Sequence, residues 1–208
     1  MLKSPYHEPV LLEEVLHFLG GARRVLDGTL GGGGHAAALL ERGIGVVGID
    51  RDPTARAEAA SRLAPYVTSG ALRIVPATFA EAATGGALGS ERFDGVLLDL
   101  GVSSHQFDDE TRGFTFREGA PLDMRMGGEG EGGFAPQRAD DWLNGETEHE
   151  LARAFKEFGD EHRARRLARI IVRRRETRPF ATSDDLVGAI RAALGPRSGA
   201  PEFARLFQ

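Results

Sequence analysis

The residues best placed to do chemistry begin with a run of four glycines. These glycines (31–34) follow the apolar segment "RRVLD" (23–27) and precede an alanine-rich stretch. The spacing G-x-G-x-x-A starts at Gly31, and Asp50 lies 19 residues further along, at the end of a second apolar run. Missing side chains let a ligand lie against the loop backbone, and the Asp50 carboxylate can accept both ribose hydroxyls of an adenosine. The pattern predicts a site for a nucleoside cofactor; the alternative is a Gly-rich turn that only joins tightly packed elements.

A second group of polar residues follows the apolar run "GVLLDL" (95–100). Asp99 lies near the end of this run and leads into the segment "GVSSHQ". Ligands of open α/β sheets lie over the carboxyl ends of the strands, so we expect Asp99 and the polar residues after it to point into a cleft. Phe79, just past another apolar run, could lie on an adenine face or belong to the core. NAD and S-adenosylmethionine both use such a site. The polar residues after Asp99 are Ser103, Ser104 and Gln106.

The elements that must position these residues alternate between strands and helices. Short apolar runs predict strands at 23–27, 45–50, 72–79 and 93–100. Helices are expected at 10–19, 35–43 and 53–66. This alternation implies right-handed crossovers and a parallel sheet covered on both faces. The first 100 residues are therefore expected to form half of a doubly wound α/β domain.

After Leu100 the sequence changes character. Residues 101–136 are loop-like, whereas helical patterns resume at about Ala139. We therefore divide the chain into the cofactor-binding half of a core (1–111) and a linker loop with a helical domain (112–208). The expected helices, with their caps, are 139–159, 160–180 (Asp160) and 182–195 (Thr182 or Ser183).

The stretch 162–178 holds eight arginines against one glutamate. On a helix, Arg165, Arg169 and Arg173 line up at intervals of four residues, and arginine suits phosphate and base contacts through its planar fork. We expect this face to bind RNA. The alternatives are a solvated face neutralised by nearby acids, or a surface that docks another protein. The opposite side of the helix is expected to be buried through Leu167, Ile170 and Ile171.

Composition excludes several classes of protein. The chain has no cysteine, which removes disulfides and cysteine-bound zinc, and its six histidines show no metal-binding spacing. We therefore expect no metal. No stretch approaches the length of about 18 apolar residues that a membrane span needs, so we expect a cytoplasmic protein without a membrane partner. A net charge of −5 means that binding to nucleic acid must come from a local patch.

Six motifs follow one another along the chain. The most specific are "DLGVSS" (99–104) and "PLDMRM" (121–126). The others are "HEPVLL" (7–12), "DGTLGGGGH" (27–35), "GIDRDP" (48–53) and "FKEFGDE" (155–161). In this order they resemble the bacterial 16S rRNA (cytosine-N4)-methyltransferases.

The resemblance implies a Rossmann-like core that uses S-adenosylmethionine and is interrupted by an inserted helical domain thought to help recognise rRNA. It implies methyl transfer to the exocyclic N4 of one cytidine in the decoding region of 16S rRNA. We expect the protein to bind this RNA within the small ribosomal subunit. The sequence does not decide whether the protein forms a homodimer. His105 stands where many members carry proline. The cofactor contacts implied by the motifs are Gly33, Gly34, His35, Asp50, Phe79, Asp99 and Gln106.

The catalytic residue is defined less sharply. The N4 lone pair is delocalised into the cytosine ring, so an acceptor for an N4–H bond would direct it toward the methyl group. Asp99 is the candidate for that role, or for fixing the cofactor. Asp123 is the second candidate, with an ion pair to Arg125 as the alternative interpretation. The D/N-P-P-Y/F signature of many amino-group methyltransferases is absent from the family and from this sequence.

The C-terminal end departs from the family pattern. The chain stops at "PEFARLFQ" (201–208), where members continue into further core strands, so we expect a fragment or a truncated product. Two other functions stay open. A NAD-dependent oxidoreductase would share the glycine loop and Asp50, and a non-catalytic RNA-binding or assembly module would need only the arginine-rich helix.

Overall fold

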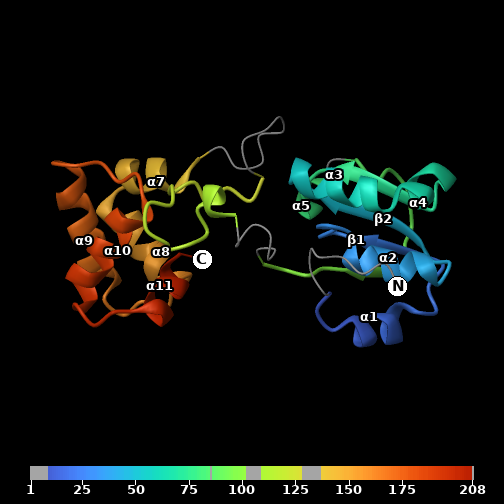
Figure 1. The fold of residues 1–208 in the computed structure, drawn as a ribbon, viewed down its shortest axis with the longest axis horizontal. Coiled ribbons are helices and arrows are strands. Elements are labelled where there is room, and N and C mark those ends of the chain that lie inside the picture. The colour runs from blue at the N-terminus through green and yellow to red at the C-terminus, as the bar shows by residue number, and fades with distance from the viewer. Residues whose placement is uncertain (1–8, 85, 102–108, 128–136, 208) are drawn as a thin grey trace. The chain divides into compact units, whose positions relative to one another are not determined.

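The computed structural model describes residues 9–84, 86–101, 109–127 and 137–207. Contacts between Cα atoms divide the chain into two compact units (Figure 1). The described residues up to Gly101 belong to the first unit, and those from Asp109 onward belong to the second. Each unit has hydrophobic clusters of its own.

The first unit is built on a parallel sheet of four strands. These are β1 (Arg24–Asp27), β2 (Gly45–Asp50), β3 (Leu72–Pro76) and β4 (Gly95–Leu97), in the order β3-β2-β1-β4 (Figure 1). Asp27 at the end of β1 is level with Gly48 of β2 and Leu97 of β4, and all neighbouring strands run parallel. All four carboxyl ends therefore lie at one edge of the sheet. The arrangement confirms the predicted Rossmann-like α/β fold.

Helices cover the sheet because its strands are apolar on both sides. They are α1 (Leu12–Leu19), α2 (Gly34–Glu41), α3 (Pro53–Arg62), α4 (Ala64–Ser69) and α5 (Phe79–Thr84). On one face, Val46 of β2 is buried in a cluster with Leu39 of α2 and Leu63 next to α3. On the other face, Val47 is buried in a cluster with Ala82 of α5.

Several elements are shorter than predicted. β4 covers only Gly95–Leu97 of the strand expected over 93–100, and proline residues explain two of the other differences. The strand expected to reach residue 79 ends at Pro76, and Phe79 instead begins α5. The helix expected over 53–66 is interrupted at Leu63, and α4 starts with Pro65 in its first turn. Proline lacks an N–H and its ring disturbs the preceding turn, so a continuous helix cannot pass through it undisturbed.

The second unit is helical in the ranges that the structure describes. Its helices are α7 (Ala139–Gly145), α8 (Glu148–Glu157), α9 (Ala164–Arg175), α10 (Ser183–Leu194) and α11 (Ala200–Leu206), preceded by the 3-10 turn η1 (Glu110–Arg112) (Figure 1). Leu151, Leu167, Ile171 and Ile190 are fully buried in one cluster, which Leu122 joins from the segment before α7. Of the helices described in either unit, none is long and apolar enough to cross a membrane.

Two helix boundaries differ from the sequence predictions, and a third decides between two predicted caps. The predicted helix 139–159 is two helices, because the Thr147 hydroxyl accepts the amide of Glu150 and caps α8. Asp160 was predicted as a cap, but this prediction is wrong: Asp160 has a φ of 46° and α9 begins only at Ala164. Thr182, rather than Ser183, is the N-cap of α10.

Candidate functional site

The sheet has a switch point between β1 and β4. The chain passes from β1 to β2 and β3 on one side, and then places β4 on the other side of β1. Ligands of open α/β sheets bind at such a point, outside the carboxyl ends of the strands. The flanking segments are residues 28–33 after β1 and 98–101 after β4. The candidate site of the first unit therefore lies between these two segments.

The loop glycines are required for two different reasons. Gly33 has a φ of 76°, which favours glycine, and a Cβ there would also lie 2.8 Å from Leu63 Cδ1. A Cβ on Gly34 would lie 2.8 Å from Cγ of the Pro9 ring, so packing within the chain disfavours a side chain there. Gly31 has a φ of 51°, but among the residues that the structure describes a Cβ there would meet only the carbonyl oxygen of Thr29, at 4.0 Å. Gly31 thus borders open space. The tight-turn interpretation fits Gly33 and Gly34, and the ligand interpretation fits Gly31.

Asp50 ties the glycine loop to the end of β2. Its Oδ2 accepts the amide of Gly31 at 2.8 Å, and its Oδ1 accepts the amide of Asp52 at 2.8 Å. Burial raises the pKa of Asp50, while the hydrogen bonds from Asp52 and Gly31 oppose that rise. A carboxylate oxygen can accept more than one hydrogen bond, so Asp50 keeps acceptor capacity for a ligand hydroxyl.

Asp27, at the end of β1, is a further candidate for the site that the sequence pattern did not single out. Its side chain is buried, Oδ1 accepts the amide of Thr29 at 3.2 Å, and Oδ2 has no partner among the residues that the structure describes. Burial raises the pKa of Asp27 to about 6, although the hydrogen bond from Thr29 opposes the rise. The signal was present in the sequence, because Asp27 ends an apolar run just as Asp50 does.

Asp99 is held in place from the loop after β1. Its backbone amide donates to Thr29 Oγ1 at 2.7 Å, and the amide of Gly28 donates to the carbonyl oxygen of Leu97 at 2.9 Å. The Asp99 side chain itself belongs to an exposed residue. Thr29 therefore fixes the backbone from which the Asp99 carboxylate projects, and it too was missed from the sequence.

Phe79 and His35 have contrasting surroundings. Phe79 is 42% exposed, which excludes the core interpretation, and its Cβ would lie 3.3 Å from a Cβ on Gly28. His35 is buried, and its Nε2 lies 2.9 Å from the carbonyl oxygen of Val10. The ring of His35 thus holds the segment that enters α1, which gives His35 a structural role at the start of α2.

Ser103, Ser104, His105 and Gln106 lie outside the described residues.

Asp123 belongs to the second unit and is engaged by Arg125. Arg125 donates to Asp123 through Nε at 2.8 Å and through Nη2 at 2.6 Å. Burial alone would raise the pKa of Asp123, but the hydrogen bonds from Arg125 and the charge of Arg138 outweigh it and lower the pKa. This geometry favours the ion-pair interpretation of Asp123.

The arginines at the N-cap of α9 and within the helix differ in their partners. Arg163, Arg166 and Arg175 donate to main-chain carbonyl oxygens, which makes them part of the packing of the second unit. Arg169 Nε lies 3.5 Å from Glu148 Oε1. By contrast, Arg165 and Arg173 are exposed and have no carboxylate partner within the described part of the chain.

The buried side of α9 also differs slightly from the prediction. Leu167 and Ile171 are fully buried, as predicted, whereas Ile170 is only partly buried and Ala168 takes its place in the core.

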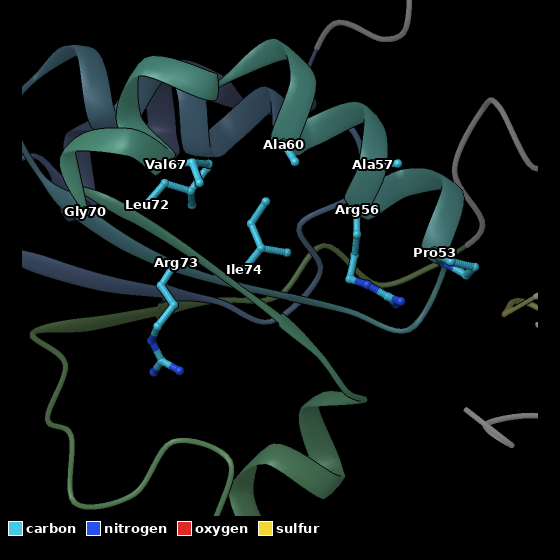
Figure 2. Close-up of a pocket in the computed structure, with 9 residues that line it drawn as sticks. All are labelled: Pro53, Arg56, Ala57, Ala60, Val67, Gly70, Leu72, Arg73 and Ile74. Atoms are coloured by element: carbon cyan, nitrogen blue, oxygen red, sulfur yellow. The ribbon is translucent and has the colours of Figure 1, made fainter. Parts of the chain in front are cut away.

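A separate depression of about 700 Å³ lies on the first unit between α3, α4 and β3 (Figure 2). Ile74 and Arg56 line it, and Figure 2 shows Arg73 pointing away from the two helices. Arg56 donates to the carbonyl oxygen of Asp50, and Arg73 pairs with Glu91. No predicted site residue lines this depression, and its two cations are already engaged.

A parallel sheet with a glycine loop and strand-end carboxylates at its switch point defines an α/β protein of the type that binds nucleoside cofactors. The chain belongs to the MraW methylase family, whose model matches residues 4–208. This match confirms the resemblance carried by the sequence motifs.

Three relatives named "Ribosomal RNA small subunit methyltransferase H" show the extent of the similarity. The protein of Gemmatimonas aurantiaca is 60% identical over 203 residues, which cover 98% of this chain and 63% of the relative. The protein of Heliobacterium modesticaldum is 42% identical, covering 91% of this chain and 60% of the relative. The protein of Caulobacter vibrioides is 44% identical, covering 93% and 59%. The chain thus spans about 60% of the length of these relatives.

Proposed function

We propose that this chain binds S-adenosylmethionine and serves in methyl transfer to the exocyclic N4 of a cytidine in the decoding region of 16S rRNA. The observation that carries the proposal is the arrangement at the switch point, where Asp27, Asp50 and Asp99 follow three neighbouring strands around the glycine loop. Membership of a methylase family supports the methyl donor over NAD. The names of the relatives support small-subunit rRNA as the substrate.

The residues present fit such a cofactor. Gly31 borders open space, so a ligand can approach the loop backbone, and Asp50 can accept ribose hydroxyls beside it. Phe79 offers an exposed ring to an adenine face. Gly33 caps α2, and its amide donates to the carbonyl oxygen of Leu30 at 2.9 Å. Gly34 and His35 open the helix, and their amides would donate to a ligand at the switch point. Gln106 would complete this set on the grounds of the motif alone.

The chemistry asks the protein mainly to orient the substrate. The cofactor supplies an electrophilic methyl group on a sulfonium. The exposed Asp99 carboxylate accepts an N4–H hydrogen bond and so turns the nitrogen lone pair toward the donor, while Thr29 fixes the backbone of Asp99. The target base must leave its stack to reach this position. Asp123 is the weaker candidate because Arg125 already occupies both of its oxygens.

Calorimetric titration of the 208-residue chain with S-adenosylmethionine, with NAD titrated beside it, tests the proposal. We expect the chain to bind S-adenosylmethionine and not NAD. Asp50→Ala should weaken the binding of S-adenosylmethionine at least about tenfold, because a hydrogen bond to a charged acceptor contributes about 1.5–3 kcal/mol. Glu58→Ala, on the neighbouring helix α3, is the control. Binding of NAD in place of S-adenosylmethionine would overturn the proposal. Binding without transfer of a labelled methyl group to small-subunit rRNA would favour the non-catalytic module.

Replacing Thr29 by valine is expected to slow methyl transfer about fivefold, because one hydrogen bond worth about 1 kcal/mol that positions Asp99 is lost. Thr29→Ser keeps the hydroxyl and should restore the rate. The measurement is kcat and KM for rRNA, together with the calorimetric Kd for the cofactor. A fall in kcat with a nearly unchanged cofactor Kd is expected, whereas an equal loss in both variants would contradict the role given to the hydroxyl.

The exposed arginines of α9 are proposed to contact RNA phosphates. Changing Arg165 and Arg173 to glutamate should weaken rRNA binding and reduce the slope of log K against log salt by about 2, since each phosphate contact contributes somewhat less than 1. Arg197→Glu makes the same charge change at an exposed position outside α9. An unchanged slope in the double variant, measured by filter binding over a range of salt, would remove α9 from the RNA interface.

A further inference from the structure

Phe158 is the most exposed large apolar side chain that the structure describes in the second unit. Its exposed fraction is 77%, whereas Phe155, one turn earlier on α8, is buried in the core. Phe158 follows the last residue of α8 and caps that helix through its amide, which donates to the carbonyl oxygen of Ala154 at 2.9 Å. The backbone of Phe158 is therefore fixed while its ring faces solvent.

The turn that carries Phe158 is built from several fixed contacts. Gly159 is packed so closely that a Cβ there would lie 2.9 Å from Leu206 Cδ2 and 2.9 Å from the carbonyl oxygen of Phe155. Asp160 adopts a φ of 46°, which is rare for a residue other than glycine. A chain that tolerates such strain in a turn needs contacts elsewhere that hold it.

Arg205 of α11 provides those contacts. Its Nη1 donates to the carbonyl oxygens of Gly159 and Asp160 at 3.0 and 2.7 Å, and its Nη2 lies 3.2 Å from Glu161 Oε2. Glu161 is buried, and its Oε1 accepts the amide of Arg163 at 2.7 Å. The exposed ring is thus presented by a rigid turn, and that turn leads directly into the arginine-rich helix α9.

Two exposed carboxylates flank the turn, and one of them, Glu157, pairs with Arg153. The exposed arginines of the helix that follows the turn favour a polyanion as the partner. Arg165 lies in the first turn of α9, and Arg173 lies eight residues later, about 12 Å along the helix axis. Both are exposed and have no carboxylate partner in the described ranges. Single-stranded nucleic acids are bound by this combination, in which cations contact the phosphates and an aromatic ring stacks on a base.

We propose that Phe158 is a stacking platform for one unpaired base of an RNA strand whose phosphates contact the exposed arginines of α9. The inference rests on the proposed function, which makes RNA the substrate, and it assigns a particular residue and a particular contact to that RNA. Because stacking needs an unpaired base, it also gives the second unit a preference for single-stranded over duplex RNA.

The test uses the 208-residue chain and an unstructured RNA oligonucleotide with a single 2-aminopurine, whose fluorescence falls when the base stacks on an aromatic ring. We expect wild-type protein to quench the probe and Phe158→Leu to lose the quenching and bind about tenfold more weakly. Phe158→Trp should restore both. The same RNA in a duplex should show no difference between the variants.

Phe18→Leu is the matched control, because Phe18 is a phenylalanine of the first unit that is 80% exposed. Equal affinity and quenching for wild-type protein and Phe158→Leu would overturn the inference, while S-adenosylmethionine titration and methyl transfer would still decide the proposed function. A parallel loss in Phe18→Leu would also overturn it. So would a change from dimer to monomer in Phe158→Leu, measured by light scattering, because the ring would then lie between two copies. If wild-type protein did not bind the RNA, the inference and the RNA part of the proposed function would both be overturned.

Discussion

Gly113→Ala is expected to lower the free energy of unfolding of the second unit by about 3 kcal/mol or more. Gly113 has a φ of 76°, and left-handed backbone costs a residue with a Cβ about 1–2 kcal/mol. A Cβ would also overlap the carbonyl oxygen of Pro121 and lie 2.7 Å from the amide nitrogen of Asp123. Because both neighbours are backbone, the segment must shift, and overpacking of this kind costs about 1–3 kcal/mol more.

Gly119→Ala separates the two contributions. Gly119 has a φ of 79°, but no described residue lies within 4 Å of a Cβ built there. Only the cost of the left-handed backbone applies, and the expected loss is about 1 kcal/mol. Urea unfolding can be followed by the fluorescence of Trp142, the single tryptophan of the chain, which packs against Phe155 in the second unit. If the free energy of unfolding fell equally in the two variants, the close backbone contact at Gly113 would not contribute to the effect of the substitution.

The reason for the close approach at Gly113 lies in how the segment before α7 joins the helices. The amide of Leu122 donates to the carbonyl oxygen of Ala181 at 3.1 Å, and the amide of Ser183 donates to that of Ala120 at 2.8 Å. Leu122 is fully buried in the core of the second unit. The motif "PLDMRM" therefore forms part of the scaffold of the helical unit, and Gly113 packs against its backbone at Pro121 and Asp123.

Local pattern was sufficient to predict the sheet and its edge. Apolar runs separated by helical stretches predicted four strands, and parallel pairing placed their carboxyl ends on one side of the sheet. The order β3-β2-β1-β4, which makes β2, β1 and β4 neighbours, came from the structure. Asp50 and Asp99 could be named for the same reason, because each lies at or just past the end of an apolar run. The errors at Pro76 and Leu63 were errors of length, where proline ended an element earlier than hydrophobicity alone suggests.

What could not be predicted depends on contacts between residues far apart in sequence. The bond between Thr29 and Asp99 spans 70 residues, and Arg205 holds a turn that lies 45 residues before it. Asp160 looked like a helix cap because aspartate is a frequent cap, but the distant contacts of Arg205 hold it in a left-handed conformation instead. Likewise, the two roles of the glycine loop could be separated only when Leu63 and Pro9 were found against Gly33 and Gly34.

Asp27→Asn is expected to stabilise the first unit at neutral pH. The pKa of Asp27 is raised from 3.8 to about 6, because burial disfavours its charge. Between these values the folded chain binds more protons than the unfolded chain, so the free energy of unfolding falls as pH rises through this window. The destabilisation by Asp27 is absent below about pH 4 and complete above about pH 6, where it reaches about 3 kcal/mol.

The sign of the effect can be checked against a second acid of the same unit. Asp94 accepts the amides of Arg23 and Arg24 at 2.8 and 3.0 Å, and these hydrogen bonds lower its pKa. A lowered pKa means that Asp94 contributes stability above its unfolded value and loses that contribution as pH falls. Asp94→Asn should therefore be most harmful at neutral pH, where Asp27→Asn should be most helpful.

Both variants are compared with wild-type protein by urea unfolding, followed by circular dichroism at about pH 4 and about pH 7. Oδ1 of an asparagine at position 27 can still accept the amide of Thr29, so the substitution removes the charge and keeps the bond. Its Nδ2 takes the place of Oδ2, which has no partner among the described residues, and this unpaired donor makes the gain smaller than the full cost of the charge. If Asp27→Asn destabilised the chain equally at both pH values, the charge on Asp27 would not lower the stability of the folded chain at neutral pH. If the gain appears only near neutral pH, the first unit keeps a strained carboxylate at its switch point, as functional sites commonly do.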